Sequence, residues 1–205
     1  MKTRTRSNAA GFTLAELMII VGVIGVLMTT ATLVMPNMLR QAKADGSTAV
    51  VVDAFRVARE RAISERRNMD LIFVPPNRIK VVREEIIFNS VTGTWSSAYG
   101  ASGNPTVMDL YLEGNQRFMY FDATGDTKDG FGLTNKPLAF HKTSMTTPIV
   151  MFTSEGTLVD ATGDPVNGTV FLAVGDQLST ARAVTIFGIT GLVRSWKWDG
   201  SKWVE

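Results

Sequence analysis

The stretch GFTLAELMIIVGVIGVLMTTATLVMP, residues 11 to 36, decides how the rest of the chain is organised. It is a mostly apolar run with a single charged side chain, Glu16. Phe12 to Met35 supplies 24 residues. An α-helix needs about 20 residues, at about 1.5 Å of rise each, to cross about 30 Å of hydrocarbon. The stretch therefore predicts a membrane-spanning helix.

Glu16 is an unusual residue for such a helix. A carboxylate inside a membrane helix is unfavourable by about 2.5–3.5 kcal/mol even on the lenient insertion scales. We therefore interpret Glu16 as a functional position whose charge gains a partner. Gly22 and Gly25 in the same run would let helices approach closely, although glycine is also simply tolerated in membrane helices.

The order of signals around this run is informative. The basic leader MKTRTRSNAA comes first, then Gly11, and only then the apolar residues. In an ordinary secretory signal the small-residue cleavage site follows the apolar run. A cut after Gly11 would instead remove the basic residues and leave the hydrophobic helix at the new N-terminus.

This arrangement resembles the type IV prepilin signal, and the matching residues are Gly11, Phe12, Thr13, Leu14 and Glu16. The resemblance implies that a prepilin peptidase cleaves between Gly11 and Phe12 and methylates the amine of Phe12. It also implies that Glu16 pairs with the N-terminal ammonium of a neighbouring subunit during filament assembly. Two other interpretations stay open, an uncleaved signal anchor and cleavage by ordinary signal peptidase after Ala44.

Charge and composition set further limits. The leader holds three of the 21 basic side chains, and 19 side chains are acidic, so the remainder has a net charge of about −1. The leader's basicity is a positive-inside orientation signal. There is no cysteine, which excludes disulfides, thiol chemistry and Cys-ligated metals. We predict no cofactor.

Residues 37–67 have the spacing of an amphipathic helix. Val51, Phe55, Ala58 and Ala62 recur at steps of three and four. Pro36 should kink the helix. The segment Asp45-Gly46-Ser47 should loosen the helix or restart it. The apolar stripe fits both a stalk packed on a sheet and a plain surface helix.

Beyond residue 67 the period changes from 3.6 to 2, which indicates strands. Residues 69–74 and 78–83 should form a hairpin through Pro75-Pro76-Asn77, with 85–89 extending its second strand. Residues 107–112 and 117–122 should form another hairpin. Further strands are expected at 137–142, 149–153, 169–174, 181–187 and 192–198. The fold class is therefore α+β, a long N-terminal helix on a β-rich antiparallel head.

The head also resembles that of type II secretion H and FimT-type minor pseudopilins. The segment FRVARERAISERR is similar to the end of that family's helix through Phe55, Ala58, Arg59, Ala62 and Ile63. The segments IVMFTSEGTL and ARAVTIFGITGLVRSWKW resemble its later strands. Residues 85–147 match nothing in the pattern.

Enzymatic chemistry has little support, and we predict no catalytic residue. His141 is the only histidine, and no metalloprotease, hydrolase or nucleotide-binding motif is present. The sequence DATGD occurs twice, at 122–126 and 160–164. Its alternating oxygen side chains could ligate calcium, but Asp and Gly also favour turns, so we predict a repeated turn and no metal site.

One cluster of basic residues is a candidate nucleic-acid patch. Its centre is Arg56, Arg59, Arg66 and Arg67, and four tryptophans could stack on bases. FimT-type resemblance gives this alternative a family rationale, as a DNA-binding minor pilin in natural transformation. Against it stand the near-neutral mature chain and glutamates at helix spacing from several of the arginines. A solvated face is the simpler interpretation.

The sequence thus predicts four segments: leader 1–11, assembly helix 12–36, stalk helix 37–67 and β-rich head 68–205. We expect a minor subunit of a type II secretion pseudopilus or type IV pilus, anchored by one span in the bacterial inner membrane with its head outside the cytoplasm. Its partners would be other pilin subunits, prepilin peptidase and the assembly platform, with nucleic acid not favoured. A membrane-anchored periplasmic enzyme or binding protein is the remaining alternative.

Overall fold

The computed structural model describes residues 12–97, 100, 103–133, 135–140 and 149–205. The chain divides into two compact units, Met1–Leu39 and Arg40–Glu205. One helix, α1, spans Leu14–Glu65 and therefore contributes to both. It runs through Pro36 without a break in the helix.

In the part of α1 that belongs to the first unit, the apolar side chains that the structure describes are exposed all round. Phe12, Leu14, Met18 and Val21 are each more than 60% exposed. The hydroxyl of Thr29 donates to the carbonyl of Gly25, and Thr30 and Thr32 make the same kind of bond to carbonyls three residues earlier. Few polar groups therefore remain on this surface. By length and composition, α1 is the one helix in the described part of the chain able to cross a membrane.

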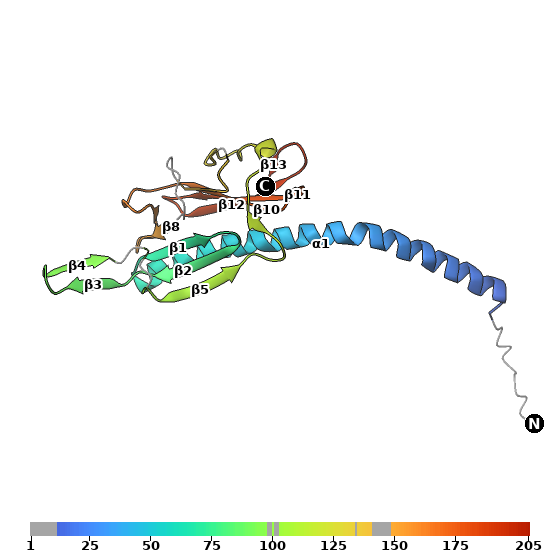
Figure 1. The fold of residues 1–205 in the computed structure, drawn as a ribbon, viewed down its shortest axis with the longest axis horizontal. Helices are drawn as coiled ribbons and strands as arrows, with labels where there is room; N and C mark the ends of the chain where they lie inside the picture. The colour runs from blue at the N-terminus through green and yellow to red at the C-terminus, as the bar shows by residue number, and fades with distance from the viewer. Residues whose placement is uncertain (1–11, 98–99, 101–102, 134, 141–148) are drawn as a thin grey trace, which may run out of the picture. The chain divides into compact units, whose positions relative to one another are not determined.

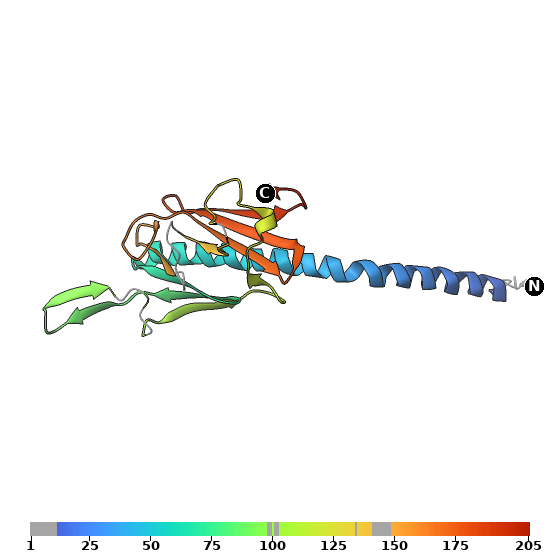
Figure 2. The ribbon, with the colours of Figure 1, turned by 45° about the horizontal axis from the view of Figure 1, so that its top comes forward.

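The second unit combines the C-terminal part of α1 with two antiparallel sheets and a separate hairpin (Figures 1 and 2). The first sheet has the order β5-β2-β1-β8-β9, and the second has the order β13-β12-β11-β10-β6, with β7 also paired to β10. The strands of the first sheet are β1 (Met69–Val74), β2 (Arg78–Arg83), β5 (Thr106–Tyr111), β8 (Ile149–Phe152) and β9 (Leu158–Val159). Those of the second are β6 (Arg117–Phe118), β7 (Leu138–Ala139), β10 (Gly168–Val174), β11 (Gln177–Phe187), β12 (Leu192–Trp198) and β13 (Trp203–Val204). Strands β3 (Ile86–Asn89) and β4 (Thr94–Ser97) pair only with each other, and a short 3₁₀ helix, η1, covers Asp122–Thr124.

The main core joins α1 to both sheets. Its helical members are buried at three- and four-residue steps, as the amphipathic pattern predicts. Phe55 lies at its centre and contacts the rings of Phe73 and Phe140, at centroid distances of 6.0 and 6.1 Å. The buried residues of α1 in this core are Val51, Ala54, Phe55, Ala58 and Ala62. A smaller aromatic cluster on the second sheet contains Phe171, Trp196, Trp198 and Trp203.

The α+β fold class is confirmed: a long N-terminal helix and an antiparallel β-rich head. The hairpin of β1 and β2 has the predicted bounds, and its register pairs Met69 with Arg83 and Val74 with Arg78. Strands β8, β10, β11 and β12 also lie where period-2 patterning places them, and β11 starts earlier, at Gln177. The short strands β9 and β13 were not predicted, because two residues give no periodicity to read.

Two predicted pairings are wrong. Residues 107–112 and 117–122 do not form a hairpin, because β5 pairs with β2 in one sheet and β6 pairs with β10 in the other. The turn between them crosses from one sheet to the other. Residues 85–89 do not extend β2 either, because β3 leaves the sheet to pair with β4.

The predicted break in α1 at residues 45–47 is also wrong, since the helix continues through them. Tertiary contacts use these three residues. Asp45 pairs with the guanidinium of Arg182, with Nε and Oδ1 2.7 Å apart. The hydroxyl of Ser47 accepts the N–H of Glu113 (2.9 Å), and a side chain at Gly46 would collide with the Glu113 carboxylate. Packing of the head therefore overrides the weak local helix propensity.

Candidate functional site: the start of the helix and the arginine cluster

The start of α1 carries the residues that the sequence singles out for assembly. Gly11 lies outside the described residues, and Phe12 is the first residue that the structure describes, with 71% of its surface exposed. The backbone N–H of Glu16 donates to Oγ1 of Thr13 at 3.2 Å. This is half of a capping box, the Ser/Thr-x-x-Glu arrangement that satisfies free N–H groups at a helix start.

Its place in the first turn of α1 gives the Glu16 carboxylate a second structural reason to be there. A carboxylate in the first turn of a helix is favoured by the positive end of the helix dipole. Glu16 makes no ion pair with any residue that the structure describes. Its charge therefore has no ionic partner in the described part of its own chain.

Two glycines follow on the same part of the helix. A Cβ atom added to Gly22 or Gly25 would meet no heavy atom within 4 Å. The fold of a single chain therefore does not require glycine at either place. Leu14, Leu17, Met18, Val21 and Gly22 line an apolar hollow on this surface. Apolar side chains around a small residue are what close packing of a second membrane helix needs.

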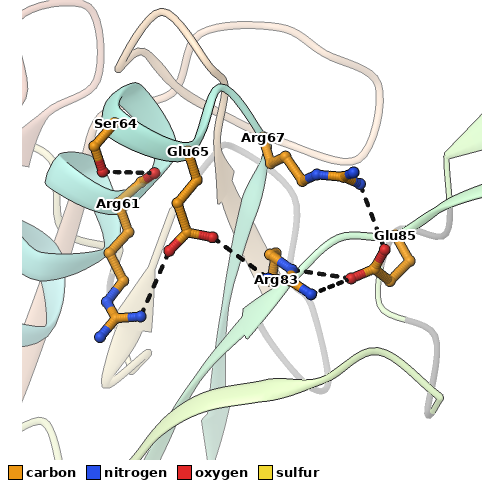
Figure 3. Close-up of polar contacts among 6 residues, drawn as sticks. All are labelled: Arg61, Ser64, Glu65, Arg67, Arg83 and Glu85. Atoms are coloured by element: carbon orange, nitrogen blue, oxygen red, sulfur yellow. Dashed lines mark hydrogen bonds and ion pairs between the residues drawn. The ribbon is translucent and has the colours of Figure 1, made fainter.

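The arginine cluster at the other end of α1 is held together by its own acids. Arg61 pairs with Glu65 at 3.5 Å, and Glu65 pairs with Arg83 at 3.6 Å (Figure 3). Glu85 accepts hydrogen bonds from Arg83 (2.7 Å) and from Arg67 (3.4 Å). Glu85 thereby raises the pKa of Arg83 above its usual range, with a smaller contribution from Glu65. Positive and negative groups alternate along this network.

Arg59 has a structural task. Its Nε donates to the carbonyl oxygen of Gly156 at 3.0 Å. Any side chain at Gly156 or at Gly191 would collide with Arg59 or its neighbour Ile63, and both glycines have positive φ angles of 82° and 66°. Arg59 therefore fixes the end of α1 to two turns of the head. This bond positions the Arg59 side chain but does not neutralise its charge, because the carbonyl is neutral.

The other arginines divide into paired and exposed ones. Arg78 forms a bidentate ion pair with Asp109, and its Cζ atom lies 5.3 Å from the centroid of the Tyr111 ring. Arg66 ends the helix with a φ of 52°, and Arg56 is exposed on α1. Neither has an acidic partner among the residues that the structure describes. Of the four residues at the centre of the predicted nucleic-acid patch, Arg67 pairs with Glu85 and Arg59 donates to a backbone carbonyl, whereas no such bond is found for Arg56 or Arg66 among the described residues.

The repeated DATGD sequences adopt two different structures. The first begins with η1 at Asp122, and Asp126 accepts N–H bonds from Thr127 and Gly132. In the second, Asp160 accepts the N–H groups of Thr162 (2.8 Å) and Asp164 (3.1 Å), which is an Asx-type turn. Within the described residues, no three His, Cys, Asp or Glu side chains are grouped as a metal site would require. His141 lies outside the described residues.

Sequence and structure comparisons show which known proteins this chain is similar to. The family model described as the prokaryotic N-terminal methylation motif matches residues 6–32. The minor pseudopilin EpsH from the type 2 secretion system of Vibrio cholerae is similar in structure, with 13% identity over 76% of this chain and 97% of that chain and a TM-score of 0.42. The type IV minor pilin FimU of Pseudomonas aeruginosa is 14% identical over 80% of this chain and 92% of that chain, with a TM-score of 0.43. No curated protein sequence matches the chain.

The N-terminal segment is an exposed apolar helix with one carboxylate, and its length and composition fit a membrane anchor. The methylation motif adds a second feature of this segment, at the level of sequence. The motif at residues 6–32 confirms the prediction of a prepilin-type signal at the N-terminus, and the chain carries a prokaryotic N-terminal methylation motif.

The sequence did not lead us to the Thr13 cap, although the Thr-x-x-Glu spacing that signals it was present. It also did not separate paired arginines from free ones. Glu65 and Glu85 are the acids that pair with these arginines. Only Glu65 is near them in sequence, because Glu85 lies beyond the end of the helix and reaches the arginines only in the fold.

Proposed function

We propose that the protein is a minor subunit of an extracytoplasmic filament, a type II secretion pseudopilus or a type IV pilus, processed after Gly11 and assembled through the helix that begins at Leu14. The observation that carries the proposal is the coincidence of the methylation motif at residues 6–32 with an apolar helix whose first turn holds a single carboxylate. The second unit supplies a head with its own core.

Processing would place an ammonium group on Phe12, four residues before Glu16. The structure leaves Phe12 outside α1 and exposed, so a peptidase could reach the bond that precedes it. In an assembled filament, the Glu16 carboxylate of one subunit would pair with the Phe12 ammonium of another. An unpaired buried charge is strongly unfavourable and a paired one is much less so, so this pairing would set the register between helices.

Before assembly the subunit would wait in the inner membrane as a single-pass protein with its head outside the cytoplasm. The basic leader would remain on the cytoplasmic side. Its partners would be prepilin peptidase, the assembly platform and other pilin-like subunits. The similarity to both a pseudopilin and a minor pilin leaves the choice between the two machines to experiment.

Mass spectrometry of the protein purified from its own cells tests the proposal. The expected N-terminal peptide starts at Phe12 and carries one additional methyl group on its amine. A mature protein that starts at Met1, or beyond Leu39, would contradict it. A Gly11→Leu variant should remain full length, and a Gly22→Leu variant provides the matched control that should be processed normally.

Co-purification separates the two machines. Sheared surface filaments that contain the subunit would assign it to a pilus. A subunit that stays with the cell envelope, and whose deletion stops export of proteins across the outer membrane, would assign it to a secretion pseudopilus.

A further inference from the structure

A hollow of about 370 Å³ lies where β12 turns into β13 at the end of the second sheet. Three parts of the head line it: the second-unit part of α1, the start of β11 and the β12–β13 turn. The lining residues are Gln41, Leu178, Ser179, Lys197, Trp198, Asp199 and Gly200. All of them belong to the second unit, so the hollow is a feature of the head itself. Its volume is in the range of small-molecule sites.

Trp198 brings a hydrogen-bond donor that lacks an acceptor. The residue is 8% exposed, and its Nε1 is buried and makes no hydrogen bond with any described residue. The other two tryptophans of the same aromatic cluster have acceptors, because Trp196 donates to Thr185 and Trp203 donates to the carbonyl of Gly125. A buried N–H group without an acceptor is unfavourable. An oxygen from a bound molecule would satisfy it.

Lys197 is a cation that lies beside another cation. The register of β11 and β12 places Lys197 directly opposite Arg182, so the two side chains share one face of the sheet. Arg182 has Asp45 as its acid at 2.7 Å, whereas Lys197 makes no ion pair with a residue that the structure describes. Like charges directly opposite each other in a sheet are unfavourable. A bound anion would offset this repulsion.

Asp199 brings a negative charge to the same hollow. Its Oδ1 accepts the N–H groups of Lys202 and Ser201, both at 2.8 Å. These bonds hold the pKa of Asp199 below its usual range, so the carboxylate is ionised at neutral pH. Its Oδ2 accepts no hydrogen bond from the described part of the chain. The hollow therefore offers an ammonium group and a carboxylate that is free to take a partner.

The place of the hollow along the chain indicates which molecules reach it. Gln41 follows Met35 by six residues, and α1 continues through both. The chain advances only about 9 Å over six helical residues. In the proposed function residues 12–36 fill the hydrocarbon, and lipid headgroups extend about 5–7 Å beyond it on each side. Gln41 then lies at the outer edge of the headgroups, where tryptophan and lysine side chains are favoured.

We propose that this hollow binds the headgroup of a phospholipid that carries both a phosphate and a primary amine. Lys197 pairs with the phosphate, Nε1 of Trp198 donates to a phosphate oxygen, and the Asp199 carboxylate pairs with the ammonium of the headgroup. The proposal rests on the proposed function in placing residues 12–36 in the bilayer. A headgroup bound here holds the head at the bilayer surface until the subunit leaves the membrane.

Native mass spectrometry of the full chain in detergent micelles tests this site. The added lipids have identical dioleoyl chains and differ in headgroup: phosphatidylethanolamine, phosphatidylglycerol without an amine, and diacylglycerol without a phosphate. The apparent Kd of the first bound lipid should be lowest for phosphatidylethanolamine. It should be about 3-fold higher for phosphatidylglycerol and at least about 10-fold higher for diacylglycerol, because charge-assisted hydrogen bonds are lost. Millimolar inorganic phosphate should leave the bound lipid in place.

Variants of the lining residues assign the contacts. K197Q should raise the Kd for phosphatidylethanolamine about 10-fold, and W198F, which keeps an aromatic ring, about 3-fold. K202Q is the matched control, because it removes the same charge from the same turn at a residue that does not line the hollow. Its Kd should equal that of the wild type. D199N should abolish the preference for phosphatidylethanolamine over phosphatidylglycerol, while its amide oxygen still accepts the N–H groups of the turn.

Equal losses in K197Q and K202Q would show a general attraction between lysines and lipid and would overturn the proposal. Diacylglycerol that binds as tightly as phosphatidylethanolamine would overturn it as well. Displacement of the lipid by inorganic phosphate would identify a soluble phosphate as the ligand instead. An unchanged preference in D199N would overturn the part assigned to Asp199. These readouts need neither cleavage after Gly11 nor filament assembly, so a failure of the proposed function would be distinguishable.

Discussion

The two units of this chain use apolar residues in opposite ways. In Met1–Leu39 the described apolar side chains are exposed, and a Cβ atom added to Gly22 or Gly25 would meet no neighbouring side chain within 4 Å among the described residues. In Arg40–Glu205 the apolar residues of α1 are buried in a core that the same unit completes. One helix thus serves two environments. The first part is composed for surroundings that the chain itself does not provide, and the second part for the chain's own head.

The largest effect should come from removing the charge of the first unit. Glu16→Val should leave processing and membrane insertion intact but abolish incorporation into filaments, because the Phe12 ammonium of a neighbour would lose its partner. Immunoblots of sheared filaments and of membranes measure both. Glu60→Val, an exposed residue of the second unit, is the matched control and should incorporate normally. Normal incorporation of Glu16→Val would show that assembly does not need the carboxylate.

Truncating one apolar side chain in each unit should have different effects on the free energy of unfolding. Phe55→Ala should lower the free energy of unfolding of the head by about 3–5 kcal/mol, because it leaves a cavity among the rings of Phe73 and Phe140. Leu17→Ala should leave that free energy unchanged. Denaturant unfolding of the full chain in detergent, followed by tryptophan fluorescence, gives both values. Equal losses in the two variants would contradict the division.

A third variant tests the ion pair that joins α1 to the second sheet. Arg182 is 2% exposed and Asp45 is 58% exposed, so Asp45→Ala would leave a buried guanidinium short of its acid. We expect a loss of about 2 kcal/mol, less than for a fully buried pair because water can reach one side. Asp53→Ala, on the exposed face of the same helix, should change stability by less than about 0.5 kcal/mol. The same unfolding experiment provides the measurement.

The smallest effect concerns nucleic acid. The arginines near the end of α1 are largely neutralised by Glu65 and Glu85, so the full chain in detergent should not shift double-stranded DNA at about 0.15 M salt. A gel shift over a salt series measures this. A shift that disappears in the double variant Arg56→Ala, Arg66→Ala would instead identify those two exposed arginines as a DNA-binding surface.

The sequence was informative where a local pattern agreed with the final contacts. The β1–β2 hairpin was predictable because two period-2 runs flank Pro75-Pro76-Asn77, and Phe55 was predictable as core from helical spacing. The candidate assembly residues came from order along the chain: basic leader, Gly11, then the apolar run. None of these inferences needed a contact between residues far apart in sequence.

The errors arose where distant segments decided the outcome. The step at 45–47 looks like a helix break until Glu113 and Arg182 pack against it. The contact between Ser47 and Glu113 also explains the missed strand pairing. It holds the turn after β5 on α1, and β5 and β6, on either side of this turn, then pair in different sheets. Likewise, a count of arginines could not show that Glu85 reaches Arg67 across 18 residues.

The contact of Ser47 with Glu113 has a mechanical consequence. Asp45, Gly46 and Ser47 lie early in the second unit and meet both sheets at once, Glu113 after β5 and Arg182 within β11. Traction along α1 would be shared between the two sheets here before it reached the aromatic core around Phe55. Such load sharing would suit a subunit that is extracted from a bilayer by its helix, because tension would be resisted by hydrogen bonds and an ion pair in parallel.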